Sequence, residues 1–143
     1  MTDRVNGAPV RLSIPARAEN LTVVRQALTG VALAVGLEEE QIEDLKLAVT
    51  EACTNVVLHA YVGRRQGRMD VQAWVDSGAV LVLVRDDGRG ITPEVERTGP
   101  GLGLGLKLIA TLARDVRITA EPGRGTSVWM AFGDREPPRP PQS

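Results

Sequence analysis

The chain has little cysteine, no long apolar run and no excess of charge of one sign. Its single cysteine cannot form an internal disulfide, so a reducing cytoplasm is the simplest compartment. With 17 basic and 18 acidic residues, the formal net charge is −1, which provides no strong field to attract nucleic acid or a membrane surface. No apolar run approaches the ~20 residues that span a bilayer, and residues 1–7 lack the apolar core of a signal peptide. We therefore expect a cytoplasmic protein with no nucleic-acid or membrane partner.

The overall composition is that of one globular domain. Of the 143 residues, 43% are hydrophobic and 24% are charged, as in ordinary soluble proteins. A chain of this length buries roughly 70% of the surface that it exposes when unfolded. We expect a flexible N-terminus over residues 1–8, a folded domain over 9–133 and a disordered, proline-rich tail over 134–143.

The most informative stretch is a helical pattern from Asp44 to Tyr61. Its apolar residues recur every three or four positions, which predicts a helix with one buried face; they are Leu45, Ala48, Val49, Ala52, Val56 and Ala60. Glu51, Asn55 and His59 follow at intervals of four and should line one strip beside that face. This strip is either a polar edge that meets water or part of a site. Cys53 lies on the apolar side and is expected to be a core residue, not a nucleophile.

The rest of the chain predicts a sheet and two more helices. Strands are expected at 10–14, 69–75, 79–84, 116–120 and 126–132, the second and third joined as a hairpin by Asp76-Ser77-Gly78. One helix should cover 18–35 and end at Gly36, and another should follow Gly105, direct Leu108, Ile109 and Leu112 inward, and end near Arg114. Three helices on one face of a mixed, mostly antiparallel sheet make an α+β two-layer sandwich.

Two glycine-rich segments are candidate phosphate- or base-binding loops. One follows a strand and contains Gly88 and Gly90, whose lack of a side chain lets the backbone approach a bound group. The other, Gly101-Leu102-Gly103-Leu104-Gly105, opens a helix, where free amides and the helix dipole favour phosphate. Such a string alone is also typical of a flexible loop. A Rossmann site is excluded because no βαβ unit surrounds it, and a Walker A loop because no Gly-Lys-Ser/Thr follows.

Together, four segments resemble the ATP-binding boxes of the GHKL superfamily, which includes gyrase, the histidine kinases and mismatch-repair ATPases. They are Glu51-x-x-x-Asn55, Asp86-x-Gly88-x-Gly90, Gly101-x-Gly103-x-Gly105 and Gly125-Thr126. Within the superfamily, Thr50-Glu51-Ala52-Cys53-Thr54-Asn55 followed by His59-Ala60-Tyr61 is most similar to bacterial anti-sigma factors with serine kinase activity, the RsbW type. The resemblance extends from about Val10 to Phe132.

The resemblance implies an ATP and Mg²⁺ site. Asn55 would hold Mg²⁺ through its amide oxygen, and Glu51 would be the general base for the attacking hydroxyl or water. Asp86 would accept a hydrogen bond from the adenine amino group, with support from Thr126. The glycines would contact the nucleotide: Gly88 and Gly90 near the base, and Gly101, Gly103 and Gly105 around the phosphates.

A few positions near these boxes have no assigned role in the chemistry. Leu58 stands where some relatives carry a Lys or Arg directed at phosphate, and Lys107 is either its substitute or a solvated surface residue. Asp87 is expected to be a turn residue and His59 a packed structural residue. The Gly99-Pro100 step is expected to hinge a lid.

The implied function is that of an anti-sigma factor. Such a protein binds a sigma factor, phosphorylates a serine of an anti-anti-sigma antagonist with ATP, and is usually a homodimer, here through the N-terminal strand and first helix. The alternatives are a binding module that holds ATP and a partner without transfer, and a detached histidine-kinase ATPase domain. Glu51 argues against the last, because histidine kinases commonly lack a carboxylate at this position. The sequence does not identify the sigma factor or the antagonist.

Overall fold

The computed structural model describes residues 10–63, 67–88 and 100–133. Along the chain the elements are β1 (Val10–Pro15), α1 (Asn20–Val35), α2 (Glu39–Asn55), the π-helix η1 (Val56–Ala60), β2 (Arg68–Asp76), β3 (Ala79–Asp86), α4 (Pro100–Leu112), β4 (Asp115–Glu121) and β5 (Gly125–Phe132). The flexible N-terminus expected over residues 1–8 and the disordered tail expected over 134–143 lie outside the described ranges.

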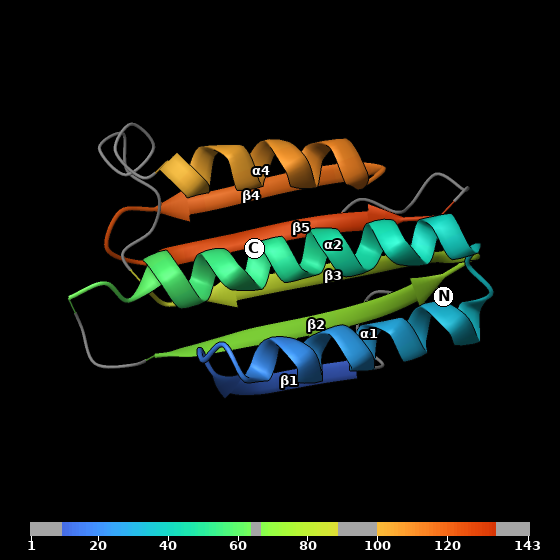
Figure 1. Ribbon diagram of the computed structural model, residues 1–143, viewed down its shortest axis with the longest axis horizontal. Helices are drawn as coiled ribbons and strands as arrows, with labels where there is room; N and C mark the ends of the chain where they lie inside the picture. Colours follow the sequence, from blue (N-terminus) through green and yellow to red (C-terminus); the bar gives the residue numbers. More distant parts are fainter. Residues whose placement is uncertain (1–9, 64–66, 89–99, 134–143) are drawn as a thin grey trace.

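The sheet has the strand order β1-β2-β3-β5-β4, and the helices all cover one of its faces (Figure 1). In Figure 1, α1 lies in front of β1 and β2, α2 in front of β3, and α4 in front of β4. The α+β two-layer sandwich is therefore confirmed. The sheet is not mixed as expected: all four pairings between described strands are antiparallel. Neighbouring strands therefore run in opposite directions.

One core fills the space between the two layers. All six apolar positions that the spacing assigned to the inner face of the central helix are buried: Leu45, Ala48, Val49, Ala52, Val56 and Ala60. They pack with the inward residues of β2, β3 and β5 in a single cluster. Cys53 belongs to it, and burial raises the pKa of its thiol to about 12, so it is a core residue as expected. None of the helices in the described ranges is long and apolar enough to span a membrane.

Local chemistry fixes the ends of these elements as predicted. The αL conformation of Gly36 ends α1. At the start of α2 the Glu38 amide donates to Gln41 Oε1 at 2.9 Å, one half of a capping box. The β2–β3 hairpin turns at Ser77 and Gly78, both with positive φ (54° and 86°), which matches the twist of the two strands.

Two expectations about the helices are wrong. The central helix does not remain α-helical to Tyr61: it is α up to Asn55 and then π over Val56–Ala60. Because a π-helix turns less per residue, the four-residue spacing no longer places His59 directly on the strip of Glu51 and Asn55. Leu108 is 42% exposed instead of inward, because the buried stripe of α4 passes through Gly105 and Ile109 and leaves Leu108 beside it. Ile109 is fully buried and Leu112 packs against the core.

Candidate functional site

The last turn of α2 meets α4 at Gly105, where the missing side chain leaves room for polar groups of α2. A Cβ on Gly105 would overlap Glu51 Oε2 and would lie 3.2 Å from Asn55 Nδ2. The structure thus brings together three of the predicted site residues, Glu51, Asn55 and Gly105. The Glu51 and Asn55 side chains are half-buried and lie against the α4 backbone.

The Asn55 amide is the least satisfied group of this contact. Its Nδ2 is buried and has no hydrogen-bond partner among the residues that the structure describes. Such a group costs roughly 1–3 kcal/mol, and native structures rarely leave one unpaired. A carboxamide can offer either its donor to a phosphate oxygen or its oxygen to a hard cation. The orphaned amide therefore fits a ligand of the predicted kind.

A cation at this place would depend on few protein ligands. In the described ranges, no group of three His, Cys, Asp or Glu side chains gathers as a metal site. Mg²⁺ is commonly held by one or two protein oxygens together with substrate phosphates and water. The chemistry of Asn55 beside the N-terminal part of α4 is consistent with that mode of binding.

The π-helix η1 begins directly after Asn55, and its last residue contacts the segment that contains Asp86 and Gly88. A Cβ on Gly88 would overlap the carbonyl oxygen of Ala60, the last residue of η1. The backbone of Gly88 therefore lies directly against η1. π-helices are rare and occur frequently at functional sites.

Asp86, at the end of β3, points its carboxylate into this region. It accepts a hydrogen bond from the Gly88 amide at 2.8 Å and one from the Thr126 backbone. Burial raises the pKa of the Asp86 carboxyl above its usual range; these hydrogen bonds oppose the rise, and the nearby Asp87 charge adds to it. A desolvated carboxylate with spare acceptor capacity is a strong recognition group for an N–H donor.

Gly125 lets β5 begin directly beside Asp86. Its φ is +110°, and a Cβ there would overlap the Asp86 carbonyl oxygen. Thr126 is then paired with Asp86 in the β3–β5 register. The structure therefore places Asp86, Gly88 and Thr126 together, as the resemblance implied.

The other predicted positions are less informative. Gly101 and Gly103 lie in the helical backbone of α4, and Gly90 and Gly99 lie outside the described residues. Lys107 is exposed, and Leu58 is 58% exposed. The role of His59, which is partly buried in η1, stays a prediction.

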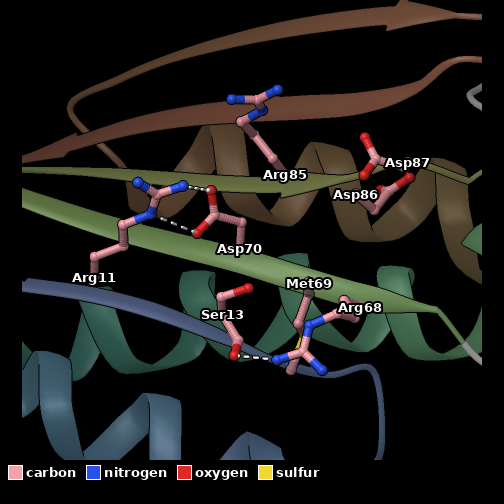
Figure 2. A pocket seen from close by; sticks show the side chains of 8 residues that line it. All are labelled: Arg11, Ser13, Arg68, Met69, Asp70, Arg85, Asp86 and Asp87. Atoms are coloured by element: carbon pink, nitrogen blue, oxygen red, sulfur yellow. Dashed lines mark hydrogen bonds and ion pairs between the residues drawn. The ribbon is translucent and has the colours of Figure 1, made fainter.

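Sequence reasoning missed Tyr61 and a cavity near it. The Tyr61 hydroxyl accepts a hydrogen bond from the Asp87 amide at 3.0 Å and donates one to the Arg68 carbonyl at 2.5 Å. The only available signal was that Tyr61, the single tyrosine of the chain, is the last residue of the helical pattern that begins at Asp44. The cavity, of about 270 Å³, is lined by Arg11, Ser13, Arg68, Met69, Asp70, Arg85, Asp86 and Asp87. Figure 2 shows Arg11 paired with Asp70, and Arg68 bonded to the Ser13 carbonyl.

Comparison with known proteins gives consistent relatives. The family described as histidine kinase-like ATPase domain matches residues 14–132. Serine-protein kinase RsbW of Bacillus subtilis is 35% identical over 132 residues, which cover 82% of each chain. RsbW of Bacillus licheniformis is 34% identical over 89% of this chain and 87% of the relative. RsbW of Listeria monocytogenes is 35% identical over 85% of this chain and 84% of the relative.

Solved structures show the same fold. The RsbU and RsbW domains of a Mycobacterium tuberculosis protein match 90% of this chain with a TM-score of 0.67 at 22% identity, and this chain spans 34% of that protein's chain. The histidine kinase domain of a blue-light-activated histidine kinase from Erythrobacter litoralis matches 92% of this chain and 71% of its own, with a TM-score of 0.56 at 25% identity.

The contact at Gly105 can be tested with a pair of matched substitutions. Gly105→Ala should gain less stability than an alanine normally gives a helix interior, because the added methyl group takes the space of the Glu51 carboxylate and pushes it aside. Gly30→Ala, inside α1 with nothing within 4 Å of the new Cβ, should raise the free energy of unfolding by about 0.5–1 kcal/mol. Urea unfolding measures both. A Gly105→Ala protein as stable as the Gly30→Ala protein would show that the close approach is wrong.

Proposed function

Because the chain belongs to the histidine kinase-like ATPase family, we propose that it binds Mg-ATP and acts as a serine kinase and anti-sigma factor. The observation that carries the nucleotide site is the buried Asn55 Nδ2 beside Gly105, which has no hydrogen-bond partner in the described part of the chain. The kinase activity is supported by the relatives named serine-protein kinase, of which this chain covers more than four fifths. A sigma factor and a serine-containing antagonist as partners follow from the same likeness.

The two ends of the nucleotide would be held by different residues. Asp86, supported by Thr126 and the Gly88 amide, offers an acceptor for the adenine amino group. Asn55 would contact the phosphate-bound Mg²⁺, and the backbone of α4 from Gly101 to Gly105 would face the phosphates. Bound Mg-ATP would supply the phosphoryl group and a cation that neutralises its charge.

Glu51 would take a proton from an attacking hydroxyl. It lies one helical turn before Asn55, and its carboxylate is next to the Gly105 backbone. A carboxylate within reach of the reacting hydroxyl increases the rate as a general base. Its presence favours transfer to serine over the function of a detached histidine-kinase domain.

The chain is also proposed to form a homodimer through β1 and α1. β1 is an edge strand of the described sheet, and an edge offers backbone groups for pairing with another strand. On α1, Val23 is 47% exposed and Leu33 is 63% exposed. Together they give this side of the molecule both an edge and an apolar surface.

Light scattering tests the assembly. At tens of micromolar the mass should be twice the 15.3 kDa of the chain. Leu33→Glu, which places a charge on the apolar surface of α1, should shift the mass toward the monomer and leave Mg-ATP binding unchanged. A monomeric parent protein would contradict the dimer without affecting the nucleotide site.

Calorimetry with Mg-ATP tests the two ends of the site. Asn55→Ala should lower the affinity by about 10-fold or more and reduce its dependence on Mg²⁺, because a hydrogen bond or ligand to a charged group is lost. Asp86→Asn should reduce the preference for ATP over GTP, because an amide replaces the carboxylate that accepts from the adenine. If both variants bind Mg-ATP and discriminate against GTP like the parent, the assignment of the site is wrong.

Glu51→Gln separates a kinase from a binding module. The substitution keeps the size of the side chain and one acceptor oxygen, but the amide cannot take a proton at neutral pH. The variant should bind Mg-ATP and sigma factor like the parent, yet transfer phosphate to the antagonist about 10²–10⁴-fold more slowly. Labelled ATP and candidate antagonists from neighbouring genes provide the assay. Equal transfer by parent and variant would contradict Glu51 as the general base, and transfer by neither would leave only the binding module.

A further inference from the structure

Tyr61 occupies a junction between three parts of the chain. It follows η1 directly, and its hydroxyl contacts both the start of β2 and the residue after β3. One hydroxyl therefore makes two backbone hydrogen bonds, as acceptor from Asp87 and as donor to Arg68. Segments that are distant in the sequence are joined at this single atom.

The ring of Tyr61 is itself held in place. A Cβ on Gly67 would overlap the ring, so the ring lies directly against the Gly67 backbone. The Gly67 carbonyl in turn accepts a hydrogen bond from the Ala16 amide at 2.9 Å, just after β1. The position of the Tyr61 ring, and with it that of the hydroxyl, is thus restricted by the backbone at the end of the sheet. Burial, with the nearby Asp86 and Asp87 charges, raises the pKa of Tyr61, which keeps the hydroxyl protonated and able to donate.

Asp87, whose amide donates to the Tyr61 hydroxyl, is adjacent in the chain to Asp86, the proposed adenine acceptor. Asp87 lies between Asp86 and Gly88 in the chain, and the Asp86 carboxylate accepts a hydrogen bond from the Gly88 amide. The backbone of this short loop is therefore fixed at Asp87 by Tyr61 and at Gly88 by Asp86 and Ala60. Without the Tyr61 contact, the loop would lose its hydrogen bond at Asp87, and the Asp86 carboxylate would rely on its hydrogen bonds from Gly88 and Thr126.

We propose that Tyr61 is a positioning residue for the nucleotide site, which holds the Asp86–Gly88 loop in register with η1. It joins the adenine end of the site to the helix that carries Asn55, without touching the nucleotide. This inference rests on the proposed binding of ATP, because it assumes that Asp86 contacts the base.

Tyr61→Phe removes only the hydroxyl and keeps the ring against Gly67. We expect ATP affinity to fall about 5- to 10-fold, the ratio of ATP to GTP affinity to fall as well, and the dependence on Mg²⁺ to remain, because Asn55 is untouched. A matched control is Thr29→Val in α1, which also removes a hydroxyl that donates to a backbone carbonyl, at 2.7 Å. The control should bind like the parent. Calorimetry with both nucleotides, with and without Mg²⁺, measures these quantities.

Amide hydrogen exchange tests the contact without any nucleotide. In Tyr61→Phe the Asp87 amide should exchange about 10-fold faster than in the parent, whereas the amides of central β3, such as that of Val82, should be unchanged. Unchanged exchange at Asp87, or an equal loss of ATP and GTP affinity in the variant, would overturn the positioning role. If the parent itself binds no Mg-ATP, the proposed function fails, and the exchange result alone still decides whether Tyr61 holds the loop.

Discussion

The close approach of α4 to α2 is the constraint on which the rest of the site depends. At Gly105 the missing Cβ leaves room for the Glu51 carboxylate and the Asn55 amide. A larger residue there would displace the Glu51 carboxylate from the α4 backbone. The same contact limits how α2 packs on the sheet, because its opposite face, through Leu45, Val49 and Ala52, is fully committed to the core.

The site concentrates polar groups that the fold alone would not select. The Asn55 Nδ2 is buried without a described partner, and burial raises the pKa of Asp86. In the folded chain both groups are less favourably solvated than they would be in water, so each opposes folding. Groups of this kind persist where a ligand compensates for them. They lie at opposite ends of η1, which agrees with one extended ligand better than with two unrelated defects.

The inner face of the central helix could be predicted because burial imposes a strict spacing, and all six apolar residues assigned to that face are buried. The hairpin at Ser77 and Gly78 follows from turn chemistry. The proximity of Asp86 and Thr126 was predicted from the resemblance, and the pairing of these two residues in the β3–β5 register explains it. The π-helix was not predictable, since Val56–Ala60 carries no local signal that distinguishes it from an α-helix. Leu108 was misplaced because it is adjacent to Ile109, and the apolar character of both residues does not show which of them faces the core.

Tyr61 was missed for a different reason, which also explains how the two ends of the site are joined. Its partners are backbone groups of Arg68 and Asp87, and a backbone partner leaves no trace in the residue types of a sequence. Yet these contacts, with those of Ala60 and Gly88, connect η1 to the end of β3. In the proposed site, the phosphate end rests on the packing of α2 against α4 and the adenine end on the β3–β5 register, and η1 lies between them. The position of Asn55 relative to the Asp86–Gly88 loop therefore depends on the contacts of η1 and of the Tyr61 hydroxyl that follows it.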